Sequence, residues 1–279
     1  MGWTILGILC IVALVCCAVG FYKYVYFLSI GYGFAVAGIS LALVVMILMG
    51  NVFPGNDPTV SAYVPSVVTW LELLLFVAYG ARLSGFLLAR EIKNANYRKT
   101  LKEATGESDE KKMPVFVKIA IWLMVGVLYV AQTSPAFFRL YNGEGASVCG
   151  YIGVAISVIG IVLEAIADKQ KDIQKKAEPS KVAMKGLYKM VRCPNYFGEI
   201  LFWTGVFVGG CDIYAGVGQW IMAAVAWVCI VFIMFNGAQR LEKRQMKRYG
   251  DEPEYNQYAD HTPIIIPLLP IYHLNKKAK

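Results

Sequence analysis

The sequence predicts an all-α, polytopic membrane protein, a helical bundle with about seven transmembrane helices. Hydrophobic residues make up 57% of the 279 residues and charged residues only 16%, with a mean hydropathy of +0.52. This balance is too apolar for a water-soluble globular domain. Apolar runs also recur along the whole chain, each near the roughly 20 residues that cross a bilayer as a helix. We therefore expect a single integral membrane domain over residues 1–279.

The predicted spans are runs that contain no Lys or Arg, apart from Arg82 in the third. They cover residues 3–21, 27–53, 65–89, 119–138, 147–167, 197–210 and 213–239. The first run is long enough to span and lacks the basic start and cleavage site of a signal peptide. An eighth apolar stretch, 262–272, is too short to cross and contains three prolines. We expect this stretch at the surface or re-entering beside the bundle.

Basic residues set the expected orientation. The net charge is +8, and Lys and Arg gather in the connections after the first, third, fifth and seventh spans. The opposite connections hold only Arg139. By the positive-inside rule, the N-terminus lies outside and the C-terminus is cytoplasmic. The connection 91–113, rich in Lys, Glu, Asp and Asn, is expected to be a mobile solvated loop or short helix.

Ionisable residues inside the spans are candidate functional residues, because a charge at membrane depth is costly. They are Glu72, Arg82, Glu164, Asp168 and Glu199. Glu164 and Asp168 are four apart and share a helical face, where both carboxylates can accept hydrogen bonds from a polar ligand. The alternative is that they pair with Lys169, Lys171 or Lys175 at the membrane interface.

Two further motifs favour an anionic ligand. In the block 192–199, Pro194 suits the first turn of a helix, Arg192 precedes it, and Asn195 and Glu199 share a face. Helix N-termini favour anions such as phosphate. In the block 240–250, basic residues recur at helical spacing and form a stripe suited to phosphates. The alternative for this stripe is contact with anionic lipid.

These blocks, in this order, resemble the C-terminal region of the steroid 5-alpha-reductase-like family of integral membrane proteins, in its largely uncharacterised branch. The resemblance is carried by LEAIADKQK at 163–171, GLYKMVRCPNYFGEILFWTG at 186–205, and LEKRQMKRYG with YNQY within 241–258. RLSGFLLARE at 82–91 extends it weakly toward the N-terminus. The resemblance implies a seven-helix bundle that opens to the cytoplasm. It further implies a reductase-like region over 113–279 that binds a dinucleotide, with residues 1–112 on the substrate side.

The resemblance also implies NADPH as the cofactor and assigns it residues. Glu164, Asp168, Asn195 and Glu199 match positions that hydrogen-bond the cofactor. The cofactor-facing blocks also contain Lys171, Arg192, Tyr196, Arg244 and Tyr258. Cys193 departs from the family pattern, in which histidine is usual. No metal site is expected, since the chain has only two histidines.

The implied catalytic residues lie in the third span. In the family's chemistry, a hydride goes to the beta carbon of an enone while an acid hydrogen-bonds or protonates the carbonyl oxygen. Tyr79 matches the catalytic tyrosine, and Glu72 lies seven residues earlier on the same helical face. The alternative for Tyr79 is an aromatic that packs the span. The second span contains no carboxylate, whereas steroid reductases place a partner for the tyrosine there.

The expected function is therefore NADPH-dependent reduction of a C=C bond in an apolar, steroid- or lipid-like enone, by an oxidoreductase acting on a CH–CH group. One alternative is an S-adenosylmethionine-dependent isoprenylcysteine or phospholipid methyltransferase, whose Arg-x-Pro-x-Tyr block resembles 192–196 and whose Glu-plus-Tyr tail resembles residues 242 and 255. Another is a non-enzymatic lipid-binding membrane protein. The sequence sets no oligomeric state.

The expected partners are a hydrophobic small molecule or lipid and the membrane lipids. Nucleic acid is not expected, because the sequence contains no recognition module. The C-terminal Lys276-Lys277-Ala278-Lys279 fits the di-lysine retrieval signal of endoplasmic-reticulum membrane proteins. In a bacterium, the same lysines would anchor a protein of the cytoplasmic membrane on its inner side.

Overall fold

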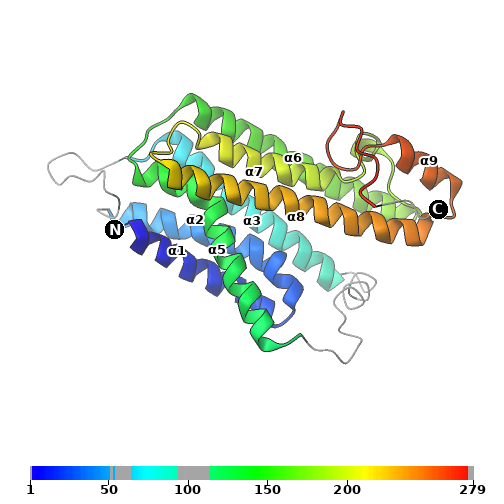
Figure 1. Cartoon of the computed structure of the whole chain (residues 1–279), viewed down its shortest axis with the longest axis horizontal. Helices are drawn as coiled ribbons and strands as arrows, with labels where there is room; N and C mark the ends of the chain where they lie inside the picture. Colours follow the sequence, from blue (N-terminus) through cyan, green and yellow to red (C-terminus); the bar gives the residue numbers. More distant parts are fainter. Residues whose placement is uncertain (1, 51–52, 54–63, 94–97, 99–112, 276–279) are drawn as a thin grey trace. The chain divides into compact units, whose positions relative to one another are not determined.

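A computed structural model describes residues 2–50, 53, 64–93, 98 and 113–275, and these residues form helices and connecting turns (Figure 1). The α-helices among them are α1 (Gly2–Cys17), α2 (Ile30–Met49), α3 (Val67–Lys93), α5 (Val115–Tyr141), α6 (Val148–Ala177), α7 (Pro194–Gly209), α8 (Val217–Tyr249) and α9 (Pro253–His261). Short 3₁₀ helices are η1 (Ala18–Phe21), η2 (Tyr24–Leu28) and η3 (Gly186–Lys189). The predicted all-α class is confirmed.

Six helical segments in the described part of the chain are long and apolar enough to cross a membrane. They are α1 together with η1, α2, α3, α5, α6 and α8. The remaining predicted span, 197–210, corresponds to α7, whose 16 residues fall short of the roughly 20 needed to cross at right angles. The chain is a multi-pass helical membrane protein, and its orientation stays a prediction.

Two segments with sequence-based expectations lie largely or wholly beyond the described residues. Of the expected loop 91–113, the structure describes the end of α3 up to Lys93, Arg98, and residue 113. The C-terminal residues 276–279, which carry the di-lysine pattern, are also outside the described part.

The chain divides into two compact units, and each is described by itself. The first comprises Met1–Tyr151 with Gly209–Ala226, and the second comprises Ile152–Val208 with Trp227–Lys279. Helices α6 and α8 begin in the first unit and continue into the second. The expected division of roles between residues 1–112 and 113–279 concerns function and stays an expectation.

Small residues allow the helices of the first unit to pack closely. A Cβ atom on Gly80 of α3 would lie 2.2 Å from the Gly33 carbonyl oxygen of α2. The Ser84 hydroxyl donates to the Ile30 carbonyl at 2.7 Å, and Ser40 donates to Leu73 at 2.7 Å. Close backbone approach and hydroxyl-to-carbonyl bonds are the usual means of joining helices in membranes.

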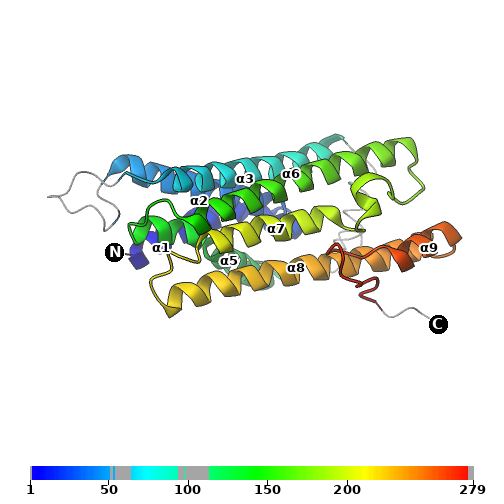
Figure 2. The same ribbon diagram turned by 90° about the horizontal axis from the view of Figure 1, so that it is seen from above.

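The same device joins α6 and α7 in the second unit, where these helices run side by side (Figures 1 and 2). A Cβ on Gly160 of α6 would lie 2.5 Å from the Phe202 backbone nitrogen, and one on Gly198 of α7 would lie 2.8 Å from the Gly160 oxygen. Ser157 donates to the Phe202 carbonyl at 2.9 Å. The contact between these two helices brings the 163–171 and 192–199 blocks next to each other.

The apolar stretch 262–272 forms no helix and packs within the second unit. The backbone nitrogens of Arg192 and Cys193 donate to the Pro263 and Ile264 carbonyls at 2.8 and 2.9 Å. Ile264 and Ile265 are buried in a cluster with Cys193, Ile200 of α7 and Ala238 of α8. The stretch therefore lies against α7 and α8 and forms one wall of the region that contains Arg192.

Candidate functional site

Glu72, in the first unit, is held by a buried arginine. The Arg139 side chain is 0% exposed, and its Nε lies 3.5 Å from Oε2 of Glu72. The same guanidinium donates to the Gly145 carbonyl at 2.8 Å and to the Gly209 carbonyl at 2.5 Å. From the sequence, Arg139 was expected in a connection between spans, and its pairing with Glu72 was not predicted. The available signal was that a carboxylate within a span requires a partner.

Tyr79 lies on the buried side of α3 within an aromatic cluster. Its ring meets Tyr32 edge to face, with ring centroids 5.8 Å apart, and Tyr32 stacks on Tyr129 at 4.8 Å. The Tyr129 hydroxyl donates to the Phe27 carbonyl at 2.5 Å. The structure therefore gives Tyr79 a packing role, and its catalytic role stays a prediction.

The acidic face of α6 lies at its contact with α7 in the second unit. Glu164 is buried, and its backbone nitrogen is 2.9 Å from the position that a Cβ on Gly198 would take. Asp168 is half-buried one turn further along. Burial raises the pKa of Tyr188, and the Asp168 charge raises it further. The Asp168 charge is therefore felt by Tyr188, which lies in η3, just before α7.

Two glutamines that the sequence analysis did not single out fix this segment to α6. Gln170 Oε1 accepts from the Leu187 nitrogen at 2.8 Å. Gln174 Oε1 accepts from the nitrogens of Met184 and Lys185 at 3.0 and 2.8 Å. No signal in the sequence marks these two glutamines, because polar residues are common at the end of a helix that is exposed to water. Their side chains thereby hold backbone nitrogens within residues 184–187, which include the start of η3.

Lysines of α6 were the alternative partners for its two acids, and Lys175 is engaged elsewhere. Its Nζ donates to the Tyr249 hydroxyl at 2.9 Å and to the Lys181 carbonyl, and it lies 5.2 Å from the centroid of the Tyr249 ring. This contact ties the end of α6 to the end of α8.

The block 192–199 takes the predicted form, with Pro194 as the first residue of α7. Asn195 and Tyr196 are half-buried, and the Tyr196 ring packs 3.3 Å from the position of a Cβ on Gly237 of α8. Glu199 is buried and accepts a hydrogen bond from Trp203 Nε1 at 3.1 Å. Arg244 is exposed further along α8.

Arg192 forms a buried ion pair with Glu242 of α8. Their side chains are 1% and 0% exposed, and Arg192 Nη2 lies 2.7 Å from Glu242 Oε1. Nη2 also donates to the Tyr272 carbonyl. Nε and Nη1 are screened from solvent but make no hydrogen bond with any residue that the structure describes. The guanidinium is therefore held by one nitrogen and has donors left for an acceptor.

Positive charge and tyrosine hydroxyls surround Cys193, next to Arg192. Burial raises the pKa of Cys193 to about 12, against the opposing charges of Lys171 and Arg192. The Tyr258 hydroxyl donates to the Tyr188 carbonyl at 2.6 Å. Burial raises the pKa of Tyr258 as well, and the Arg192 charge opposes that rise. The charges of Lys171 and Arg192 thus both act on Cys193, and the Arg192 charge also acts on Tyr258.

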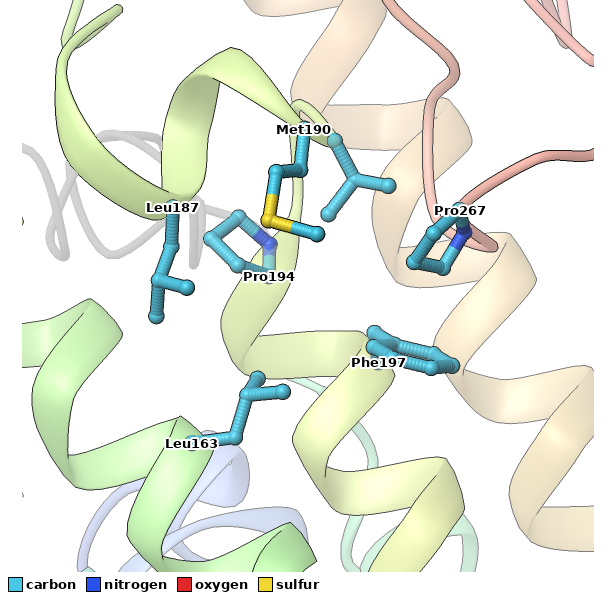
Figure 3. A pocket seen from close by; sticks show the side chains of 7 residues that line it. Leu163, Leu187, Met190, Pro194, Phe197 and Pro267 are labelled. Carbon is cyan, nitrogen blue, oxygen red and sulfur yellow. The ribbon is translucent and has the colours of Figure 1, made fainter.

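A small apolar cavity of about 40 Å³ adjoins these residues (Figure 3). It is lined by Leu163, Leu187, Met190, Val191, Pro194, Phe197 and Pro267. Leu163 precedes Glu164 in the chain, and Pro194 and Phe197 flank Asn195 and Tyr196. The second unit therefore offers apolar surface directly beside its candidate polar residues.

Glu242 is a functional candidate whose contacts were not predicted from the sequence. Besides Arg192, its Oε1 lies 3.0 Å from His273 Nδ1. Its Oε2 accepts from the Leu274 and Asn275 backbone nitrogens, each at 2.9 Å, and from Asn275 Nδ2 at 2.8 Å. The sequence signal was an isolated acid within the basic block 240–250.

The chain is distantly similar to a steroid 5-alpha-reductase. It is 24% identical to the steroid 5-alpha-reductase DET2 of Gossypium hirsutum over 233 residues, which cover 77% of this chain and 85% of that protein. A family model described as "Protein of unknown function (DUF1295)" matches residues 39–262. That match extends from within α2 to the end of α9. It includes all the predicted catalytic and cofactor-binding residues, from Glu72 to Tyr258. This chain belongs to the DUF1295 family.

Proposed function

We propose that this protein is a membrane-embedded, NADPH-dependent reductase of a C=C bond in an apolar, steroid- or lipid-like enone. The distant similarity to a steroid 5-alpha-reductase extends over most of the chain and supports a reductase-like membrane protein. The observation that carries the proposal is the buried Arg192 guanidinium, whose Nε and Nη1 make no hydrogen bond of ordinary geometry with the described residues, although the Tyr255 hydroxyl lies nearby. Buried donors without an acceptor are costly, and a phosphate oxygen would satisfy them.

The donor set of the second unit fits a dinucleotide. Arg192 and Lys171 both supply positive charge that acts on Cys193, and α8 carries the exposed Arg244. The carboxylates of Glu164, Asp168 and Glu199 can accept hydrogen bonds from hydroxyl or amide groups. The residues that we propose to hold NADPH are Glu164, Asp168, Lys171, Arg192, Asn195, Tyr196, Glu199, Arg244 and Tyr258. When bound, NADPH would supply a hydride.

We propose Tyr79 as the residue that acts on the substrate. Its phenol would donate to the carbonyl oxygen of the enone and stabilise the negative charge that develops there. Glu72 is proposed as the second catalytic residue, on the same helix, with its carboxylate engaged by Arg139. The buried surroundings of Tyr79 suit an apolar substrate.

A methyltransferase that uses S-adenosylmethionine is the second candidate function. One specific observation favours it: Arg192 and Glu242, which belong to the two motifs shared with such enzymes, form an ion pair at 2.7 Å. Tyr255, from the same tail motif, is also buried in this region. The reductase is preferred because it also accounts for the α6 acids and for the similarity of most of the chain to a reductase.

Thermal unfolding of the detergent-purified protein with each cofactor separates these functions. A ligand that binds only the folded state raises the unfolding midpoint, by about 2.7 kcal/mol in unfolding free energy at a hundred times its Kd. We expect NADPH to raise the midpoint and S-adenosylmethionine to leave it unchanged. Stabilisation by S-adenosylmethionine alone would reject the reductase. A response to neither would favour a non-enzymatic lipid-binding protein.

A further inference from the structure

The chain end that follows the last buried proline-rich stretch is folded back onto α8. The Leu274 carbonyl accepts from Gln239 Nε2 at 3.2 Å, and Asn275 Nδ2 donates to the Gln239 carbonyl at 2.9 Å. The backbone nitrogens of Leu274 and Asn275 both donate to Glu242 Oε2. We call residues 272–275 the C-terminal clasp. It is attached at two sites one turn apart on the same helix.

The clasp saturates the Glu242 carboxylate. Oε2 accepts three hydrogen bonds from the clasp, and Oε1 is shared between Arg192 at 2.7 Å and His273 Nδ1 at 3.0 Å. Because the carboxylate is 0% exposed, these contacts fix its orientation. A buried carboxylate with all its acceptor positions occupied cannot rotate without losing several charge-assisted bonds.

His273 extends the chain of contacts to a second acid. Its Nε2 lies 2.8 Å from Asp260 Oδ1 of α9, while Nδ1 faces Glu242. The imidazole therefore bridges α9 and α8. Successive contacts thus connect four side chains, in the order Asp260, His273, Glu242 and Arg192.

Arg192 is the last of these four side chains and receives two contacts. Both go to Nη2, from Glu242 Oε1 and from the Tyr272 carbonyl of the clasp. Nη2 carries two N–H groups, so both are used. Nε and Nη1 keep their donors, and the nearby Tyr255 hydroxyl is likewise buried without a hydrogen bond of ordinary geometry to a described residue. The Arg192 charge and a side-chain contact with Arg192 both oppose the burial-driven rise in the pKa of Tyr255, so the Tyr255 hydroxyl lies beside the guanidinium.

We infer that the C-terminal clasp is a positioning element of the cofactor site, in which His273 and Glu242 orient Arg192 so that its Nε and Nη1 edge faces a phosphate group of the ligand. This inference rests on the proposed function and deepens it. The clasp and Glu242 take the Nη2 side of the guanidinium, so the remaining edge is the one offered to the anion. His273, Glu242 and Asp260 act through Arg192 and do not touch the ligand themselves.

The chain provides a matched control, because it has two histidines. His261 is exposed at the end of α9, and its Nδ1 contacts only the Gln257 carbonyl of the same helix, at 2.8 Å, among the contacts of the described residues. The test therefore compares His273→Gln with His261→Gln in the full chain in detergent. NADPH binding is measured by equilibrium titration, and the unfolding midpoint is measured without ligand.

We expect His273→Gln to weaken NADPH binding about tenfold, the effect of losing one hydrogen bond to a charged group, and His261→Gln to leave it unchanged. The decisive arm repeats His273→Gln in an Arg192→Met background. If His273 acts through Arg192, the two effects are not additive and the second substitution changes the Kd by less than about twofold there. Equal fold-changes in both backgrounds, or an unchanged Kd for His273→Gln in the wild-type background, would overturn the inference.

Asp260→Asn keeps the test informative should His273→Gln fail to fold. The Asp260 side chain is 37% exposed, so this neutral isostere is tolerable at its site. We expect it to weaken NADPH binding about threefold in the wild-type background and not in the Arg192→Met background. An equal effect in both would overturn the inference. Absence of NADPH binding by the wild-type protein would reject the proposed function and this inference together, whereas wild-type binding that ignores both substitutions would reject the inference alone.

Discussion

Among the residues that the structure describes, each unit contains one buried arginine paired with a glutamate, and the two pairs are built differently. Arg139 of the first unit directs Nη1 and Nη2 to the Gly145 and Gly209 carbonyls, and its Nε faces Glu72 at 3.5 Å. Arg192 of the second unit uses only Nη2, and its Nε and Nη1 make no hydrogen bond within the described chain. Both terminal nitrogens of the Arg139 guanidinium donate to carbonyls, and its Nε faces a carboxylate without a hydrogen bond to a described residue, whereas only one terminal nitrogen of Arg192 is hydrogen-bonded.

The two glutamates show the reverse difference in the number of their hydrogen-bond and ion-pair partners. Among the described residues, Glu72 is paired with Arg139, whereas Glu242 contacts Arg192, His273 and three donors from residues 274–275. Removal of Arg139 would therefore leave a buried acid poorly compensated, but removal of Arg192 would leave an acid that is still hydrogen-bonded. This contrast separates an arginine that holds the fold from one that is available to a ligand.

The largest expected effect comes from Arg139→Met. Breaking a buried ion pair on one side typically costs about 3–5 kcal/mol, since the remaining charge is uncompensated. We expect a marked fall in the unfolding midpoint of the detergent-solubilised protein, and partial recovery when Glu72→Met is added. Arg240→Met, which removes an exposed arginine, is the control. A midpoint for Arg139→Met equal to that control would show that the pair does not hold the first unit.

Arg192→Met is expected to act on binding more than on folding. NADPH affinity should fall about a hundredfold, because two or more charge-assisted hydrogen bonds to an anion are lost. The unfolding midpoint should fall less than for Arg139→Met, because Glu242 keeps the donors of His273, Leu274 and Asn275. Arg90→Met, which removes an exposed arginine of α3 outside the proposed cofactor residues, serves as control. The comparison breaks down if Arg192→Met unfolds the protein as strongly as Arg139→Met.

The sequence predicted the helices better than their ends. The predicted spans 147–167 and 213–239 end about ten residues before α6 and α8, which run to Ala177 and Tyr249. Hydropathy reports where a helix leaves the membrane, whereas Lys, Glu, Gln and Arg are good helix formers that continue it in water. The same distinction explains α7, which is apolar throughout but too short to be classed with the long spans.

The sequence could predict which candidate residues share one helix, because this follows from local spacing. It could not predict which residues pair across long stretches of the chain. Glu164 with Asp168, and Pro194 with Asn195 and Glu199, are read from positions no more than five apart on one helix. Arg192 meets Glu242 across 50 residues and Tyr272 across 80. No periodicity connects such positions, and residues 272–275 carry no motif. The Glu72–Arg139 pair escaped prediction for the same reason.

Glu199→Gln sharpens the comparison by testing whether the surroundings of Arg192 form one binding site. Glutamine keeps an oxygen that can accept from Trp203 Nε1, so the fold should be unaffected. We expect NADPH affinity to fall about tenfold, the effect of one charged hydrogen bond, with an unchanged unfolding midpoint. Ligand titration and thermal unfolding of the same preparation give both values. An unchanged Kd would remove Glu199 from the site and leave Arg192 as an isolated feature.

The smallest effect is expected for Ser147→Ala, which removes one of several acceptors around Arg139. The Ser147 hydroxyl lies 3.4 Å from Arg139 Nη1 and 3.0 Å from Asp212 Oδ1, but the same Nη1 also donates to Gly145 at 2.8 Å. Because Arg139 keeps its carbonyl partners, the loss should be about 1 kcal/mol in unfolding free energy. Ser134→Ala, whose hydroxyl bonds only within its own helix among the described contacts, should change it by less than about 0.5 kcal/mol. A loss for Ser147→Ala as large as that for Arg139→Met would mean that the serine, and not the carbonyls, secures the arginine.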